Sequence, residues 1–278
     1  MTSNLMIRDR CFEWGRRTYL MGVLNVTPDS FSDGGEFNAI ASALAQAQAL
    51  QAAGADIIDI GGQSTRPGAE QIPVAEELNR VLRVLRPEIS LPISVDTTRS
   101  EVAIAALEAG ADIVNDISGG MFDPEMLPSV ARLGVPIILM HMRGTPQTMQ
   151  KMTDYQDLMG EIGNFFSERI ATAIATGIDQ QKIIIDPGIG FAKNYEQNLE
   201  IFRRLPELRK LNCPILVGPS RKSFIGRILN QPDPKARVLG TAAACCAAIF
   251  AGTDILRVHD VKQMHDVCLV ADAIFRQS

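Results

Sequence analysis

Short apolar segments recur along the chain, and each is followed by a polar loop and then by a stretch rich in Ala and Leu. The apolar segments show little alternation of polar and apolar residues, which indicates parallel strands that are buried on both faces. We predict about eight strands, over residues 19–24, 57–60, 93–95, 113–114, 135–140, 183–185, 215–217 and 255–258.

The Ala- and Leu-rich stretches between these segments are predicted to be helices. The clearest cover residues 39–53, 75–86, 101–109, 155–176, 198–209 and 237–251. Eight strand–helix units in one chain predict an α/β protein, a single (β/α)8 TIM barrel that forms one domain over residues 1–278. A doubly wound open sheet is the alternative, but no G-x-G-x-x-G string follows the first strand. Residues 5–17 precede the first unit, and we expect them to form a short hairpin that closes the floor of the barrel.

Composition narrows the class of protein. With 278 residues, 46% of them hydrophobic, the chain has enough apolar material for one large core. The net charge of −5 and the lack of a basic run argue against nucleic-acid binding. There is no signal-peptide pattern and no apolar run of about 18 residues, so we expect a cytoplasmic protein that does not enter membranes. Five cysteines without a C-x-x-C pair indicate small buried side chains in a reducing compartment.

Polar residues end almost every predicted strand, and in a TIM barrel the active site lies at those carboxyl ends. A single Asp there usually caps a helix or forms a turn. The same placement on most strands of one barrel instead predicts a shared polar pocket. The residues concerned are Asn25, Asp59, Asp96, Asn115, Asp116, His141, Asp186, Ser220–Ser223, Arg257 and His259.

This predicted pocket is mixed in charge. Asp96, Asn115 and Asp186 offer acceptors, which suit a ligand with amidine-like N–H donors. Positive charge from other side chains suits phosphate or carboxylate; these side chains are Arg66, Lys222, Arg257 and His259. An Asn or Asp beside a bound diphosphate suits Mg²⁺, which prefers oxygen ligands. Three histidines are too few and too scattered for a zinc site.

Seven strings, found at successive strand ends, make the chain similar to a known family. In chain order they are MGVLNVTPDSFSDGG, DIGGQSTRPGA, SVDTTR, VNDISGG, IDPGIGF, GPSRKSFIG and ILRVHDV. With them the chain resembles bacterial dihydropteroate synthase over nearly its whole length. The resemblance implies a transferase of folate biosynthesis and a sulfonamide target, which joins 6-hydroxymethyl-7,8-dihydropterin pyrophosphate to p-aminobenzoate and releases pyrophosphate. The family is commonly dimeric, and the apolar stretches 237–250 and 261–275 are expected to contribute a homodimer interface.

The same resemblance assigns roles to residues. Those implied to bind the pterin are Asp96, Asn115, Met140, Asp186, Lys222 and Arg257. Those implied to bind the diphosphate are Asn25, which would also hold Mg²⁺, Arg257 and His259. Asp59 is expected to orient Asn25 and Arg257. The four residues expected to act in catalysis are Asn25, Lys222, Arg257 and His259. The reaction would be loosely SN1-like and need no strong base, so leaving-group stabilisation and positioning carry it.

Two loops are implied to close over the diphosphate and to form the p-aminobenzoate pocket. The first follows Asn25 and carries Phe31, and the second carries Thr65, Arg66 and Pro67. The remaining walls are expected to be Phe191, Lys222 and Ser223. The chain departs from the family at one position, Gln63, where Glu is usual, and this change removes a charge beside the second loop.

Two other functions fit part of this pattern. A pterin-binding methyltransferase barrel would share the acceptors Asp96, Asn115 and Asp186, but we would not expect it to carry both loop strings together with SRKS and RVHDV. A non-catalytic homologue would bind without turnover, although every residue needed for turnover is present. Pyrophosphate release that depends on both substrates separates the three.

Overall fold

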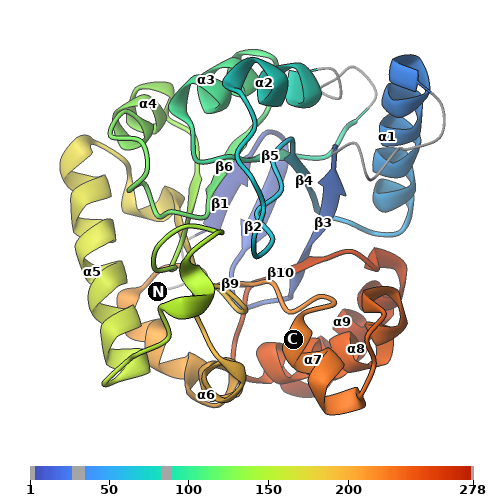
Figure 1. Ribbon diagram of the computed structural model, residues 1–278, viewed down its shortest axis with the longest axis vertical. Helices are drawn as coiled ribbons and strands as arrows, with labels where there is room; N and C mark the ends of the chain where they lie inside the picture. The colour runs from blue at the N-terminus through green and yellow to red at the C-terminus, as the bar shows by residue number, and fades with distance from the viewer. Residues whose placement is uncertain (1–3, 27–34, 83–88, 277–278) are drawn as a thin grey trace.

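Eight parallel strands form a barrel, and the helices surround it (Figure 1). The computed structural model describes residues 4–26, 35–82 and 89–276, with the backbone alone for 35–39. Neighbouring strands follow the order β8-β7-β6-β5-β4-β3-β10-β9, and a parallel bridge between Ile185 and Ile215 joins the two ends of the sheet. The predicted TIM barrel is therefore confirmed. Its strands are β3 (Tyr19–Asn25), β4 (Ile57–Gly61), β5 (Ile93–Asp96), β6 (Ile113–Asp116), β7 (Ile137–Met140), β8 (Ile183–Asp186), β9 (Leu216–Val217) and β10 (Ile255–Val258).

Successive residues of each strand point alternately out toward the helices and into the barrel. Outward side chains such as Leu20, Ile58 and Val114 pack under the helices in one large apolar cluster. The inward side chains at the amino ends of the strands are also apolar, and they include Ile57 and Ile184. Both faces of these strands are thus buried, which explains why their sequences show so little alternation.

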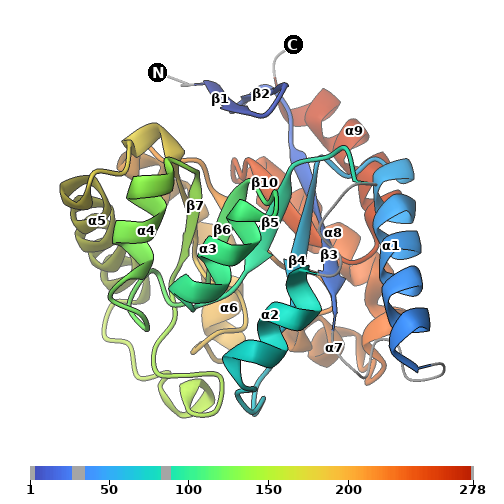
Figure 2. The ribbon, with the colours of Figure 1, turned by 90° about the horizontal axis from the view of Figure 1, so that it is seen from above.

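The N-terminal hairpin closes the amino end of the barrel, as predicted. Strands β1 (Asn4–Ile7) and β2 (Arg10–Glu13) pair antiparallel and lie at the end of the barrel away from the strand tips (Figure 2). Phe12 and Trp14 pack on Tyr19, with ring centroids 4.7 and 5.5 Å from the Tyr19 ring. The opposite end, where the strands finish, is left for the polar side chains.

Most of the predicted helices are present with small shifts at their ends. The helices are α1 (Gly35–Ala52), α2 (Val74–Leu82), α3 (Ser100–Glu108), α4 (Met126–Leu133), α5 (Leu158–Thr176), α6 (Tyr195–Arg204), α7 (Ser223–Leu229), α8 (Val238–Phe250) and α9 (Val261–Phe275). Helix α4 was not among the predicted segments, because it has only 8 residues and contains Pro128 in its first turn, where proline is tolerated. Short 3-10 helices cover Met149–Lys151, Gln180–Lys182, Leu205–Leu211 and Pro234–Arg237.

Helix α6 illustrates how local sequence sets these ends. Asn194 and Gln197 form a capping box, so the helix starts at Tyr195 and earlier than its apolar residues suggest. The predicted segment 198–209 continues past Arg204 as the 3-10 helix Leu205–Leu211, which has Pro206 in its first turn. In the part of the chain that the structure describes, no helix combines the length and the apolar character needed to cross a bilayer.

Candidate active site at the barrel mouth

Strand register brings three of the predicted site positions, Asn25, Asp96 and Asn115, into one row with Gly61. Asn25 pairs with Gly61, Gly61 with Asp96, and Asp96 with Asn115, at the carboxyl ends of β3 to β6. Gly61 has no side chain, and a Cβ placed there would lie 3.6 Å from the Cβ of Asp96 and 3.9 Å from Oδ1 of Asn25. The missing side chain keeps this side of the mouth open between an amide and a carboxylate.

Arg257 ties the row to the opposite side of the barrel. Its Nε donates to Asp59 Oδ2 at 2.6 Å, and its Nη2 donates to Asp96 Oδ2 at 2.8 Å. Asn115 Nδ2 also donates to Asp59, at 3.2 Å from Oδ2. Asp59 is fully buried, so its charge depends on these two partners. Because Nε and one N–H of Nη2 are engaged, Nη1 and the second N–H of Nη2 are left to meet a ligand.

One oxygen of Asp96 has no partner among the described residues. Its Oδ1 is buried and accepts no hydrogen bond, whereas Oδ2 accepts from Arg257. Burial raises the pKa of Asp96 to about 7, against the lowering effect of the Arg257 charge. An unpaired buried acceptor is costly, and a ligand N–H would remove that cost.

Asp186 and Lys222 lie on the other side of the same mouth. Asp186 Oδ1 accepts the backbone N–H of Gly188 at 2.7 Å, and burial raises the pKa of its carboxyl group. The Lys222 ammonium lies 4.3 Å from the centre of the Phe191 ring. Burial, and then the neighbouring charge of Arg257, lower the pKa of Lys222 to about 8. The mouth therefore holds a cation on an aromatic face close to a carboxylate.

Met140 ends β7 directly beside Asp186, with which it is paired in the sheet. It is buried and belongs to a small apolar cluster that also includes Ile117 and Met142, with Phe191 packed against it. A polarisable sulfur among apolar side chains suits the face of a flat ring.

His259 is held by Ser220, a contact that the sequence motifs alone did not reveal. The hydroxyl of Ser220 accepts the backbone N–H of His259 at 3.2 Å and lies 3.0 Å from Nδ1 of the same residue. Its own proton can then go to Nδ1, which leaves the proton of a neutral ring on Nε2. Burial, and then Arg257, lower the pKa of His259 to about 3. A pKa of about 3 leaves the His259 ring neutral at pH 7, whereas the sequence suggested a cation.

A buried lysine behind the mouth was also missed. Lys193 is only 2% exposed, and its ammonium donates to the carbonyl of Phe191 at 2.9 Å and to the carbonyl of His141 at 3.3 Å. It thereby joins the loop after β8 to the end of β7. The only signal in the sequence is a charged residue that directly follows the string IDPGIGFA.

The predicted p-aminobenzoate residues are only partly placed together. Phe191 and Lys222 are in contact, and Ser223 is the exposed first residue of α7. Thr65 is half-buried and Arg66 and Pro67 are exposed on the segment between β4 and α2. Phe31 lies outside the described residues.

Asn25 is the residue predicted to hold the metal ion. It is half-buried at the end of β3 and offers a neutral amide oxygen, which is a hard ligand that fits Mg²⁺. Within residues 4–26, 40–82 and 89–276, no three His, Cys, Asp or Glu side chains gather as a metal site. An ion here would take most of its ligands from a bound diphosphate and from water.

Comparison with known proteins identifies the family of the chain. The sequence profile described as "pterin binding enzyme" matches residues 21–259. The chain is 59% identical over 275 residues to dihydropteroate synthase of Synechocystis sp., covering 98% of this chain and 95% of that protein. Its fold matches Yersinia pestis dihydropteroate synthase in complex with a sulfonamide drug, with a TM-score of 0.91, 42% identity and coverage of 98% and 99%. It also matches Xanthomonas albilineans dihydropteroate synthase with 4-aminobenzoic acid, with a TM-score of 0.91, 41% identity and coverage of 99% and 98%.

Proposed function

The chain belongs to the pterin binding enzyme family as a dihydropteroate synthase, and we propose that the polar mouth of its barrel is where the two substrates meet. It joins 6-hydroxymethyl-7,8-dihydropterin pyrophosphate to p-aminobenzoate and forms 7,8-dihydropteroate and pyrophosphate in folate biosynthesis. The observation that carries our placement of the pterin is the unpaired Oδ1 of Asp96. It is a buried acceptor, and the amino-pyrimidinone edge of a pterin carries N–H donors.

The pterin then lies among Asp96, Asn115 and Asp186, with its donor edge toward these side chains. Lys222 supplies a donor to the ring's acceptor side. Met140 and the plane of Arg257 cover its two faces. Asp186 has one oxygen on Gly188 N–H, which leaves the other for the ligand.

The diphosphate lies at the outer side of Arg257. Its negative charge would meet Nη1 of Arg257 and an Nε2 proton of His259, and Asn25 would offer its amide oxygen to Mg²⁺. When bound, Mg²⁺ would neutralise part of the charge on the leaving pyrophosphate. Asp59 holds the guanidinium in place through the 2.6 Å contact, so the donor is oriented before the substrate arrives.

Catalysis in this arrangement is positioning and charge stabilisation. The C–O bond to pyrophosphate breaks, and its electrons leave with the anion that Arg257 and His259 stabilise. The amine of p-aminobenzoate attacks the same carbon, and the proton that it loses can pass to the departing pyrophosphate or to water. An aryl amine is already nucleophilic, so no strong base is needed.

The p-aminobenzoate ring would lie against Phe191, with Phe31, Thr65, Arg66 and Pro67 as the other walls. Lys222 and Ser223 at the start of α7 would face its carboxylate. A sulfonamide that resembles p-aminobenzoate would occupy the same pocket.

An exposed apolar surface on α8 and α9 supports a homodimer. Leu239 is 85% exposed and Phe250 73%, and the Phe250 ring lies 5.1 Å from that of Phe275. Val270 and Ile274 on α9 extend the surface. Light scattering should give twice the chain mass, and Val270→Asp should shift it toward the monomer. A cytoplasmic location fits the five cysteines, all of which are unpaired.

The direct test is pyrophosphate release that requires both substrates. Asp186→Asn should weaken pterin binding at least tenfold, measured by calorimetry. The amide would keep Oδ1 on Gly188 and turn its NH₂ group toward the ligand's N–H donors. Asp266→Asn, on a side chain that is 82% exposed, is the matched control. Unchanged pterin affinity in Asp186→Asn would place the pterin elsewhere.

A further inference from the structure

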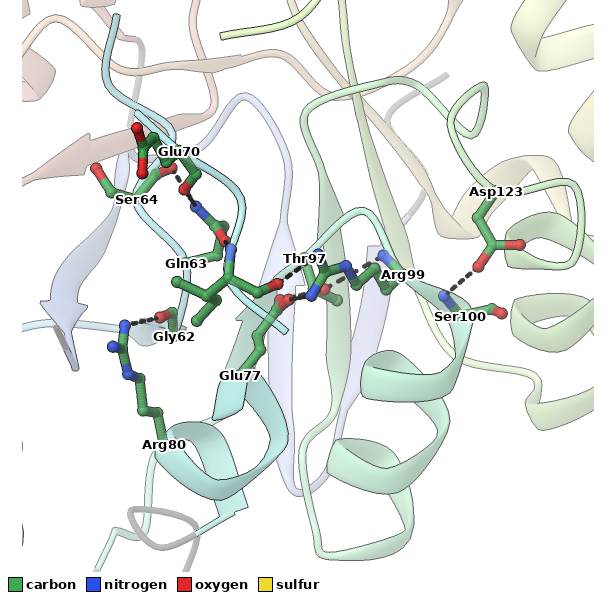
Figure 3. Close-up of polar contacts among 11 residues, drawn as sticks. Gly62, Gln63, Ser64, Glu70, Glu77, Arg80, Thr97, Arg99, Ser100 and Asp123 are labelled. Carbon is green, nitrogen blue, oxygen red and sulfur yellow. Dashed lines mark hydrogen bonds and ion pairs between the residues drawn. The ribbon is translucent and has the colours of Figure 1, made fainter. Parts of the chain in front are cut away.

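The segment 62–73, called here the second loop, is held at several points along its length. Arg80 Nη1 donates to the carbonyl of Gly62 at 2.9 Å, and Arg99 Nη2 donates to the carbonyl of Ile72 at 2.7 Å. Between these ends, the N–H of Gly68 donates to the carbonyl of Pro146 at 3.0 Å. The loop therefore has a defined conformation, and its two ends are attached to α2 and to the segment before α3 (Figure 3).

Arg99, which holds the carbonyl of Ile72, is itself held by a buried carboxylate. Glu77 on α2 is 2% exposed and accepts from Arg99 Nη1 at 2.9 Å and from the hydroxyl of Thr97 at 2.6 Å (Figure 3). This ion pair, between a buried carboxylate and a half-buried guanidinium, orients the guanidinium that holds Ile72. Thr97 directly follows Asp96 and shares Glu77 with Arg99. The end of the loop at Ile72 is therefore connected, through Arg99 and Glu77, to the strand end that is proposed to bind the pterin.

Inside the loop, the side chain of Gln63 links the two ends. The Nε2 of Gln63 donates to the carbonyl of Ser64 at 2.9 Å and to the carbonyl of Glu70 at 2.8 Å. Its Oε1 accepts the backbone N–H of Ile72 at 2.8 Å. These contacts join the start of the loop to its end, and Thr65–Pro67 form the part that they enclose.

The contacts require an amide. Two carbonyl oxygens must face a donor and one N–H must face an acceptor, so the orientation of the Gln63 amide is determined by its surroundings. A carboxylate could still accept from Ile72, but its second oxygen would face the carbonyls of Ser64 and Glu70 with no proton between them. Gln63 is thus the side chain that braces the loop.

We propose that Gln63 is a positioning residue for p-aminobenzoate, because it holds the second loop so that Thr65–Pro67 form a wall of the pocket. This inference rests on the proposed function of that loop. In this proposal Gln63 acts through the loop backbone, to which all three of its hydrogen bonds go. It sets the affinity for the second substrate, whereas the pterin site on Asp96, Asn115 and Asp186 does not depend on it.

The test compares Gln63→Glu with two matched variants. Gln71→Glu places the same new charge on the same loop at an exposed position, and Gln63→Met keeps the length of the side chain without polar atoms. At pH 8, Gln63→Glu should raise the KM for p-aminobenzoate at least fivefold and change the KM for the pterin substrate less than twofold. Gln71→Glu should leave both unchanged.

The pH dependence distinguishes bracing from a general structural defect. In Gln63→Glu, the protonated carboxyl group has an O–H that can donate to one of the two carbonyls. The KM of this variant for p-aminobenzoate, relative to the parent enzyme, should therefore recover as the pH falls from 8 to 5.5. The defect of Gln63→Met should not change with pH. Hydrogen exchange adds a readout without turnover. The amide of Ile72 loses its acceptor in Gln63→Met and should exchange faster there. The backbone amides of residues 64–70 should exchange faster in both variants, because the ties to the carbonyls of Ser64 and Glu70 are lost.

Two failures remain distinguishable. If the parent enzyme turns over both substrates while Gln63→Glu keeps its KM for p-aminobenzoate and its exchange rate in the second loop, the role of Gln63 is wrong. If the exchange rate rises as expected but the parent enzyme does not require p-aminobenzoate for pyrophosphate release, the proposed function is wrong.

Discussion

The ammonium of Lys193 lies 3.0 Å from Nδ1 of His141, and both side chains are buried. Since Lys193 also donates to two backbone carbonyls, Nδ1 of His141 is the acceptor in this pair. Burial, followed by the charge of Lys193, lowers the pKa of His141 to about 2. Burial also lowers the pKa of Lys193 to about 7. The pair links the end of β7 to the loop that carries Phe191.

This arrangement predicts a contribution to acid sensitivity. The unfolded chain binds a proton at His141 below about pH 6.5 and the folded chain does not until about pH 2, so His141 makes stability fall as the pH drops below 6.5. His141→Gln, which keeps an acceptor for Lys193, should remove that slope. The free energy of unfolding in urea at pH 7.5 and pH 5 measures it. Between pH 7.5 and pH 5, the free energy of unfolding of the parent protein should decrease more than that of His141→Gln, by up to about 1.4 kcal/mol per pH unit. Parallel losses in the two proteins would contradict this assignment.

Asp96 predicts a pH dependence of pterin binding. Its pKa is raised to about 7, and a proton on the carboxyl group would remove an acceptor from the ligand's donor edge. Affinity for 6-hydroxymethyl-7,8-dihydropterin, which lacks the titrating diphosphate, should therefore decrease as the pH falls below about 7. Calorimetry between pH 5.5 and 8.5 tests this expectation. A constant dissociation constant across that range would mean that Asp96 keeps its charge throughout or does not face the pterin.

Arg257→Lys should lower kcat/KM at least tenfold although it keeps the positive charge. A lysine cannot donate in parallel to Asp59 and Asp96, so the cation loses its orientation toward the leaving group. Arg203→Lys on the exposed side of α6 is the control and should retain full activity. Near-normal turnover of Arg257→Lys would show that the oriented guanidinium is not needed.

Binding of p-aminobenzoate should be ordered, with p-aminobenzoate last. Its proposed pocket includes the first loop, and bound diphosphate with Mg²⁺ would bring that loop and Asn25 together. Pyrophosphate and Mg²⁺ should therefore tighten p-aminobenzoate binding at least tenfold, and p-aminobenzoate should tighten pyrophosphate binding by the same factor. Calorimetric titrations in both directions measure the coupling. Equal affinity for p-aminobenzoate with and without pyrophosphate would rule out the ordered binding.

Several features of the site are readable in the linear sequence, because they depend on local order. A parallel strand that is buried on both faces needs a continuous apolar run, and in a barrel all such strands end at one mouth. The polar residues at those ends, such as Asp96 and Asp186, could therefore be assigned to one pocket without coordinates. The resemblance carried by the seven strings then implied the reaction.

The partners within that pocket depend on tertiary structure, since register and packing bring together residues that are far apart in sequence. Arg257 and Asp59 are separated by 198 positions, and nothing local to either predicts their contact. The same holds for the unpaired oxygen of Asp96, which exists only because Arg257 engages its other oxygen. Burial also changes the protonation and the partners of these side chains. The His259 ring is neutral and contacts Ser220, and Lys193 joins the end of β7 to the loop after β8 through two backbone carbonyls. From the sequence, Gln63 could be described only as a position that lacks a charge. Its role in holding the second loop depends on the fold, because two carbonyls and one N–H converge on its amide.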